Sequence, residues 1–253
     1  MHFRLLCLCA LALPVACTVK EDRFECPCEF TLDLSECQIK DDVLTFLIGD
    51  DGKKIVSDYY YRDDLGKKYS FQLERKVFSG SAYTGDSNSL HDGWNLMVKY
   101  GLQADSLYAW VQKIDATGES ANEIVLLHKQ FATITFDLSE YDNAESPFLV
   151  RLTSNYGGID LLSLEPVKNE FLYEFETDGS RFYPVRLTRQ GDSSLTMEIL
   201  SGDVSIAKIN IAAVLDSNGY DWSAADLADI TVSVSVKDAD ITVTPDPWKD
   251  VDI

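Results

Sequence analysis

Histidine and cysteine are the side chains most often used for acid–base and nucleophilic chemistry near neutral pH, and few of them are placed for catalysis in this chain. The histidines are His2, His91 and His128. His128 ends the apolar run 124–127, as expected of a residue at the edge of a strand, and His91 lies in a polar loop. The sequence therefore predicts no catalytic residues and a protein that is not an enzyme.

Two other segments contain chemically suggestive residues in the wrong arrangement. The Gly-Asp-Ser-Asn sequence at 85–88 resembles an esterase block, but that chemistry needs a serine after a buried strand and a distant Asp-x-x-His, and no histidine follows His128. Residues 216–221 have the composition of a calcium loop, but the glycine falls too early and Leu227 stands where a bidentate glutamate is required. We expect an ordinary turn there, and no metal site.

The cysteines divide into three groups. Cys7 and Cys9 lie in an apolar leader, Cys17 follows it, and Cys26, Cys28 and Cys37 remain for the folded chain. On a strand, Cys26 and Cys28 would point to one face. A disulfide from Cys37 to either of them, or buried free thiols, is favoured over a metal site, because no histidine lies nearby. One of the three must stay unpaired, and the pairing is left open.

Residues 1–16 read as a signal peptide, with Arg4 as the basic start and an apolar run at 5–13 that is too short to span a bilayer. The Leu-Pro-Val-Ala-Cys sequence at 13–17 resembles a bacterial lipobox, in which a small residue precedes a cysteine that receives diacylglycerol. Pro14 departs from the usual leucine. Lipidation of Cys17 is favoured over an ordinary cleaved signal, and residues 17–25 would form a polar tether.

Charge and hydropathy exclude several functions. The formal net charge is −20, which repels phosphate backbones and anionic headgroups, so nucleic acid is excluded as a partner. A hydrophobic content of 45% is enough for a core. No segment after the leader approaches the ~18 apolar residues of a membrane-spanning helix. Membrane attachment would therefore depend on the lipid, and no other cofactor is expected.

The elements that would position these residues are strands. Short segments rich in Val, Ile, Thr, Tyr and Phe alternate with Gly, Asp, Asn and Ser turns. In the first half they lie at 43–48, 55–61, 69–75, 94–100, 107–112 and 123–128. In the second half they lie at 131–138, 148–153, 170–175, 183–188, 195–200, 204–211, 229–236 and 240–244. The pattern predicts an all-β protein of two tandem sandwiches, at 26–128 and 129–253, with one short helix capped by Ser223.

Aromatic residues leave a second function open. Tyr59, Tyr61, Trp222 and Trp248 could form a platform for stacking sugars if they are exposed, whereas Trp94 and Trp110 alternate with apolar neighbours and are expected in the core. A surface glycan-binding lipoprotein is therefore the alternative to the function considered next.

Three blocks together resemble one family, the fimbrillin-A-associated anchor proteins, which are minor lipoprotein subunits of type V fimbriae in Bacteroidetes. The first block runs from Cys17 through Lys20-Glu21-Asp22-Arg23 and Cys26-Pro27-Cys28 to 31–34, the second covers 185–189 and 195–199, and the third comprises Trp222, 226–230, 240–243 and Trp248. The Lys-Glu-Asp triplet also resembles the surface-export signal of Bacteroidetes lipoproteins.

The resemblance implies two transthyretin-like sandwich domains, a lipid anchor in the outer membrane, exposure on the cell surface, and no enzymatic activity. It also implies that the chain fixes a fimbria to the cell, limits its length, and has a shaft fimbrillin as its partner. Whether it also binds a host or bacterial surface ligand is left open.

Assembly of such fimbriae proceeds by donor strands, and an arginine-specific protease opens the groove of shaft subunits. The resemblance implies that an anchor keeps its own first strand and donates a C-terminal one. The candidate donor residues are Ile241, Thr242, Val243 and Thr244. Pro245 and Pro247 would confine pairing to these residues or to those beyond Trp248, because proline has no backbone N–H.

Overall fold

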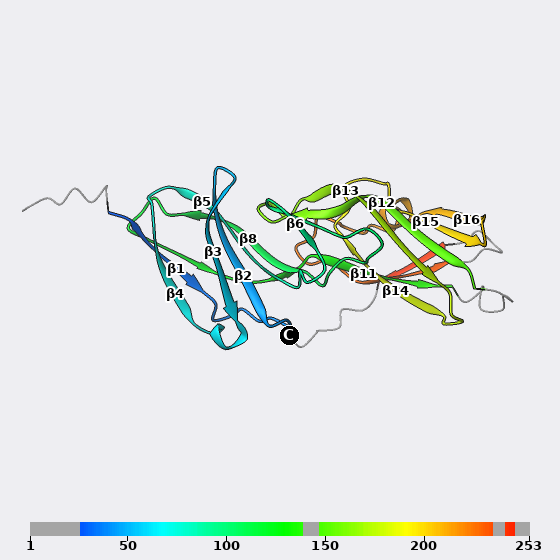
Figure 1. Ribbon diagram of the computed structural model, residues 1–253, viewed down its shortest axis with the longest axis horizontal. Coiled ribbons are helices and arrows are strands. Elements are labelled where there is room, and N and C mark those ends of the chain that lie inside the picture. Colours follow the sequence, from blue (N-terminus) through cyan, green and yellow to red (C-terminus); the bar gives the residue numbers. More distant parts are fainter. Residues whose placement is uncertain (1–25, 139–146, 235–240, 246–253) are drawn as a thin grey trace, which may run out of the picture.

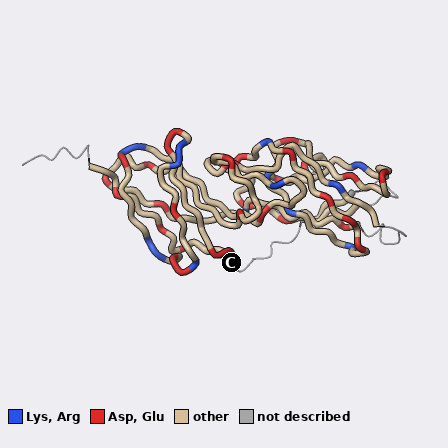
Figure 2. The backbone as a smooth tube through the Cα atoms, viewed as in Figure 1, with Lys and Arg blue, Asp and Glu red and all other residues tan. Residues whose placement is uncertain are grey.

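The computed structural model describes residues 26–138, 147–234 and 241–245, and it consists of two β-sandwiches arranged one after the other along the long axis (Figure 1). The predicted signal peptide, Cys17, the tether and Trp248 lie outside the described residues. Acidic residues are distributed along both sandwiches (Figure 2). The expectation of an all-β sandwich protein is confirmed.

The first sandwich pairs a three-stranded sheet of order β4-β1-β9 with a five-stranded sheet of order β10-β8-β5-β2-β3. β9 runs parallel to β1, and the other pairs in these two sheets are antiparallel. Their bounds are β1 (Cys28–Asp33), β2 (Val43–Asp50), β3 (Lys53–Tyr61), β4 (Lys68–Leu73), β5 (Val77–Thr84), β8 (Tyr108–Asp115), β9 (Ser120–Ile124) and β10 (His128–Lys129), with a short 3-10 helix at Arg62–Asp64.

The second sandwich pairs a sheet of order β14-β11-β17-β18 with one of order β16-β15-β12-β7-β6, in which β13 lies on the other side of β12. The helix α1 (Ile211–Ser217) packs on this sandwich. The strands are β6 (Leu90–Asp92), β7 (Asn95–Met97), β11 (Phe131–Asp137), β12 (Leu149–Asp160), β13 (Pro166–Glu176), β14 (Phe182–Thr188), β15 (Thr196–Ser201), β16 (Val204–Asn210), β17 (Ile230–Val234) and β18 (Ile241–Pro245).

Strand alternation places one face of each sheet in a core. In β1, Phe30 and Leu32 are completely buried, and Phe30 stacks on Phe46 from β2 in the other sheet and on Phe71 from the neighbouring strand β4. Full burial of such side chains contributes about 1.5–3 kcal/mol each. The second core is built in the same way around β11, β12 and β17, and α1 closes one part of it with Ile211 and Leu215.

Residues 90–97 leave the first sandwich and pair in the second one. β7 pairs with the end of β12, and Gly101 N and Ala104 N then donate to carbonyls of Leu172 and Arg186 in β13 and β14. The boundary expected near Lys129 assigns these residues to the first domain, whereas their hydrogen bonds belong to the second. Residues 90–97 thus link the two sandwiches, because the chain pairs in the second sandwich there and then returns to the first at β8.

The joint between the sandwiches has its own apolar cluster, formed where the outer face of the five-stranded sheet meets β7 and the turn after β12. It contains Leu47, Tyr83, Leu96, Leu107, Ala109, Ile159 and Leu161, with Trp94 and Leu164 packed against it. The Trp94 ring lies so close to Gly49 that a Cβ there would be 2.7 Å from it. The Trp94 indole N–H also donates to the Gly52 carbonyl at 2.7 Å, which fixes the ring.

The expected helix at Ser223 is wrong. The Ser223 hydroxyl donates to Asp221, while the helix of the second sandwich is α1, where the Asn210 side chain accepts from Ala213 N at 2.8 Å as the N-cap. Three strands, β1, β5 and the short β6, are also absent from the expected series.

Asp33 fastens the end of β1. It is almost fully buried, and its carboxylate accepts from Lys68 Nζ at 2.6 Å and from Ser35 N at 3.0 Å. The hydrogen bond from Lys68, aided by those from Ser35, lowers the pKa of Asp33 from 3.8 to about 2. A lowered pKa means that the charged carboxylate stabilises the fold above pH 4 and loses this effect as the pH falls toward 2.

We therefore expect Asp33→Asn to lower the free energy of unfolding at pH 7, and the difference from the native chain to shrink as the pH falls from about 4 to about 2. Urea unfolding at a series of pH values measures this. The control is Asp63→Asn at an exposed position, for which we expect no such dependence. A difference that stays constant across the acid range would contradict the assigned role of the Asp33 carboxylate.

Candidate functional site

The first candidate feature is β1, because it connects the folded chain to residue 17. β1 occupies the centre of its sheet, with β4 paired antiparallel along Cys28–Asp33 and β9 paired parallel from Glu29 onward. Both of its backbone edges are therefore used within the chain. Cys28, Phe30 and Leu32 are completely buried beneath it. Removing β1 would open a groove between β4 and β9 and expose the core.

The three cysteines of the described part are free thiols. Cys28 and Cys37 are buried and Cys26 is exposed. Between Cys28 and Cys37 the chain first runs the length of β1, about 16 Å at the usual rise per residue, which separates the two thiols. Burial raises the pKa of the Cys37 thiol to about 11, so it stays protonated and unreactive. The sequence left a disulfide or buried free thiols open, and in the structure Cys28 and Cys37 are buried free thiols.

The candidate donor residues Ile241, Thr242, Val243 and Thr244 lie in β18, at one edge of the sheet β14-β11-β17-β18. β18 pairs antiparallel with β17 from Ile230↔Pro245 to Val234↔Ile241. Val243 packs against the core of the second sandwich, while Thr242 and Thr244 are exposed. β18 is therefore a strand of its own domain, with its other edge unpaired by any described residue.

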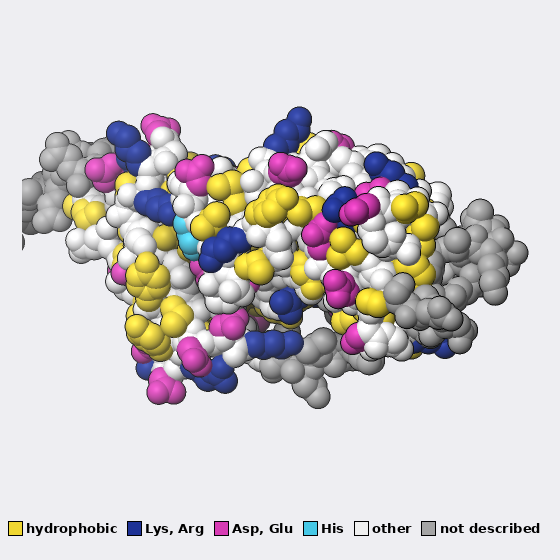
Figure 3. Space-filling view, turned by 45° about the vertical axis from the view of Figure 1, so that its right-hand side comes forward, with side chains coloured by type: hydrophobic (Ala, Val, Ile, Leu, Met, Phe, Trp, Pro, Cys, Tyr) yellow, Lys and Arg dark blue, Asp and Glu magenta, His cyan; other side chains and the backbone are white. Residues whose placement is uncertain are grey.

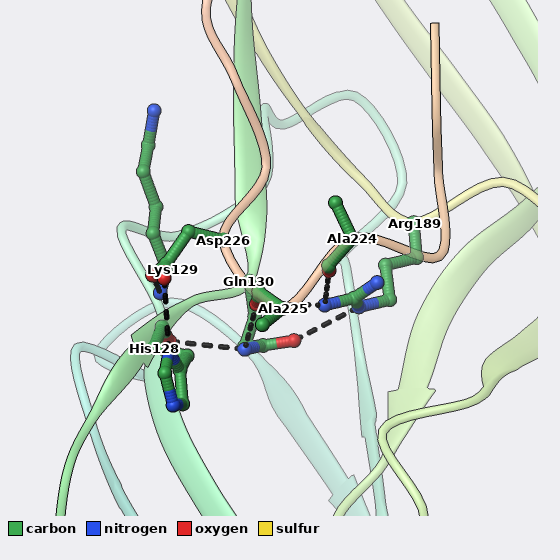
Figure 4. Close-up of polar contacts among 7 residues, drawn as sticks. All are labelled: His128, Lys129, Gln130, Arg189, Ala224, Ala225 and Asp226. Carbon is green, nitrogen blue, oxygen red and sulfur yellow. Dashed lines mark hydrogen bonds and ion pairs between the residues drawn. The ribbon is translucent and has the colours of Figure 1, made fainter. Parts of the chain in front are cut away.

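A buried polar cluster joins the two sandwiches (Figure 4). Arg189, at the end of β14, donates to Gln130 Oε1 at 2.8 Å and to the carbonyls of Trp222, Ala224 and Ala225 at 2.6, 2.7 and 3.1 Å. Arg189 is 6% exposed, and burial lowers the pKa of its guanidinium. No described carboxylate lies within ion-pair distance of it. Arg189 therefore fixes the 222–225 loop by hydrogen bonds to backbone carbonyls.

Asp226 fastens the same loop to the connection between the sandwiches. Its carboxylate accepts from Lys129 N at 2.6 Å and lies 2.8 Å from His128 Nδ1. The next carboxylate, Asp229, accepts from Thr133 N and Lys129 Nζ. These residues belong to the blocks from which the family resemblance was inferred, and the structure brings them together around residues 128–133. Their observed role is to hold the joint.

The other residues that the sequence suggested for chemistry, His91, His128 and Asp221, contact polar groups of their own chain. The His91 ring lies 2.7 Å from Asp86, and His128 contacts Asp226, with no serine or cysteine joined to either among the described residues. Asp221 accepts from Ser223 N and Oγ in a local turn. No group of metal-binding side chains occurs within 26–138, 147–234 and 241–245. In the same part of the chain, no helix has the length and hydropathy to cross a membrane.

The aromatic residues are divided between core and surface. Trp110 is buried, as expected, and Trp94 is half-buried in the joint. Tyr59 and Tyr61, on the outer face of the edge strand β3, are 61% and 59% exposed. Hydrophobic side chains are visible on the surface of the first sandwich (Figure 3). Trp222 is half-buried against the second core, whereas Tyr59 and Tyr61 belong to the first sandwich, so these three residues do not form one row, and Trp248 lies outside the described residues.

Comparison of the sequence with protein families gave no match, and comparison with curated proteins gave none either. Comparison of the fold with solved structures gave matches over nearly the whole chain. The fimbrial anchor protein Mfa2 from Porphyromonas gingivalis is 14% identical, with a TM-score of 0.57 over 88% of this chain and 98% of that chain.

Two structures from Bacteroides thetaiotaomicron are equally similar. A proposed adhesin is 14% identical, with a TM-score of 0.58 over 86% of this chain and 96% of that chain. A proposed polysaccharide-binding protein is 12% identical, with a TM-score of 0.59 over 88% of this chain and 99% of that chain. At these identities the comparison establishes a shared fold, and it confirms the predicted likeness to fimbrial anchor proteins at that level.

Proposed function

We propose that this chain is the basal subunit of a surface fimbria, tethered to the outer membrane by a lipid on Cys17. The observation that carries the proposal is the position of β1 in the centre of its sheet, with both edges paired within the chain. A sheet completed in this way offers no groove for a strand from another subunit at that place. We therefore place this subunit at the start of a donor-strand assembly.

The sequence between β1 and β2 supports the retention of β1. Residues 34–42 contain no arginine, so an arginine-specific protease cannot separate β1 from the rest of the chain there. The first arginine after β1 is Arg62, which follows β3 and donates to the Lys40 carbonyl at 2.6 Å. β1 therefore stays attached to the strands that follow it.

The attachment point for the next subunit lies at the other end of the chain. β18 is held by β17 and by Val243 in the core, so releasing it would uncover the second sandwich. The eight residues that follow, 246–253, include Trp248, Val251 and Ile253, whose side chains could fill pockets in a partner. We assign donation to residues 246–253 and pairing in cis to β18.

Two truncations test this assignment. Removal of residues 246–253 should leave a folded, membrane-bound protein that sheds its fimbriae into the medium, which immunoblotting of membrane and medium fractions measures. The matched control replaces the same residues with a Gly-Ser segment of equal length, and it should shed fimbriae too. If shedding required removal of all residues after Val236, β18 itself would be the contact. Fimbriae retained by both truncations would contradict the proposal.

A second function, binding of surface glycans, is favoured by the exposure of Tyr59 and Tyr61 on one face of β3. Exposed aromatic rings in a row suit stacking against sugar rings. The two functions differ in a simple observation: an anchor subunit co-purifies with sheared fimbriae, whereas an independent glycan-binding lipoprotein does not.

A further inference from the structure

A cleft of about 540 Å³ lies between the two sandwiches, beside the Arg189 cluster. Both halves of the chain line it. The first contributes Trp110, Gln112, Leu126 and His128, and the second contributes Glu165 and Trp222. Its volume falls within the range of small-molecule sites, about 300–1,000 Å³.

Two indole N–H groups at this cleft have no acceptor. The Trp222 N–H is enclosed and unpaired among the described residues. Trp110 is 8% exposed, and its six-membered ring is packed beside Gly80, with Cζ3 3.2 Å from the position of a Cβ there. The Trp110 N–H has no partner in the described part of the chain, and it is not enclosed like that of Trp222. Buried tryptophans usually satisfy this donor, so the enclosed Trp222 N–H is an exception, whereas the Trp110 N–H is open to a ligand in the cleft.

The remaining lining supplies both donors and acceptors. The Gln112 amide and the Glu165 carboxylate are exposed and have no side-chain partner among the described residues. The Nδ1 atom of His128 is hydrogen-bonded to the Asp226 carboxylate, so Nε2 remains available to a ligand. Leu126, 47% exposed, adds an apolar surface.

We infer that this cleft binds a neutral, hydroxyl-rich ligand of the size of a short oligosaccharide. Sugar hydroxyls accept from the Trp110 indole and the Gln112 amide and donate to Glu165. Their C–H faces pack on Leu126 and the indole rings. An anionic ligand would meet Glu165 in a chain of net charge −20, and the Arg189 guanidinium, which also lines the cleft, already donates to Gln130 and to three backbone carbonyls. A wholly apolar ligand would leave Glu165 and Gln112 desolvated without partners. This site is separate from Tyr59 and Tyr61 and does not depend on the role in a fimbria.

The test is a titration of the lipid-free mature chain with maltose, cellobiose, lactose and N,N′-diacetylchitobiose, followed by tryptophan fluorescence and by saturation-transfer NMR. We expect at least one of these disaccharides to bind with a Kd of the order of 1 mM. Trp110→Phe, which keeps a ring in the core, and Gln112→Ala, at an exposed position, should each weaken binding about tenfold. The control Tyr59→Ser/Tyr61→Ser should bind as the native chain does.

Three outcomes would overturn the inference. One is that no disaccharide of the panel binds at concentrations up to about 10 mM, well above the expected Kd. Another is that Tyr59→Ser/Tyr61→Ser loses binding while Trp110→Phe and Gln112→Ala keep it. The last is that sialyllactose, which adds a carboxylate to lactose, binds more tightly than lactose. Thermal unfolding of each variant establishes that a lost signal is not lost folding.

Discussion

Replacing Cys17 with alanine is expected to release the protein and its fimbriae together into the medium. The sulfur of Cys17 is the proposed site of the diacylglycerol, and alanine offers no nucleophile for that transfer. Each buried CH₂ of an acyl chain contributes about 0.8 kcal/mol to membrane binding, so the loss of two chains removes nearly all affinity for the bilayer. Fractionation of cells into membrane and medium, with electron microscopy of the shed material, measures the result.

The design must separate lipidation from signal cleavage, because an uncleaved leader would itself hold the chain in a membrane. In the decisive variant an ordinary cleaved secretion signal replaces residues 1–16 and Cys17 is alanine. The control Cys26→Ala removes an exposed thiol of the folded part and should remain membrane-bound. If the decisive variant stayed in the membrane fraction, an element other than the lipid on Cys17 would attach the protein to the membrane.

The strands could be predicted because burial of one sheet face imposes alternation that is visible in the sequence. β3 and β11 illustrate this, since each coincides closely with an expected segment. β5 (Val77–Thr84) was missed because its sequence is rich in small residues. Gly80 is required there, since a Cβ would lie 2.6 Å from Ile114 Cδ1 and 3.2 Å from the Trp110 ring. The side chains that leave room only for a small residue in β5 belong to β8, about thirty residues further along the chain.

The helix and the excursion of β6 and β7 could not be predicted for a similar reason. Ser223 and Asp226 have the spacing of a helix cap, but Asp226 bonds to Lys129 N, 97 residues away in the chain. The alternation around residues 94–100 predicts a strand without identifying its sheet, and the structure pairs β7 with β12. The local sequence pattern indicates the type of element, whereas the partners of Asp226 and of β7 are determined by tertiary contacts.

The Arg189 cluster is a case in which the sequence marks residues without indicating their role. Arg189 and Trp222 belong to separate blocks of the family resemblance, and their contact spans 33 residues. The structure makes the contact intelligible, because the guanidinium has several donors in a plane and meets three carbonyls and the Gln130 amide oxygen. Because one guanidinium serves all of these acceptors, we expect replacement of Arg189 to have a large effect on the free energy of unfolding.

Arg189→Met is expected to lower the free energy of unfolding by about 3–5 kcal/mol, although methionine has a similar length. The substitution removes a buried charge, but it leaves the carbonyls of Trp222 and Ala224 and the Gln130 amide oxygen without their donor, while the Ala225 carbonyl keeps the donor from Gln130 Nε2. Arg189→Lys should fall between the native chain and Arg189→Met, because an ammonium group has fewer donors and cannot span all four acceptors. Guanidinium unfolding of the lipid-free chain, followed by tryptophan fluorescence, measures both variants.

The matched control is Arg62→Met. Arg62 also donates to backbone carbonyls, those of Lys40 and Asp41, but its side chain is 58% exposed. Water can replace its donors there, so we expect a loss of about 0–1 kcal/mol. The contrast isolates burial as the cause, because both arginines bond to carbonyls and only one is enclosed. Equal and small losses for the two variants would mean that water reaches the Arg189 carbonyls, and that the joint is held mainly by the apolar cluster around Leu47 and Tyr83.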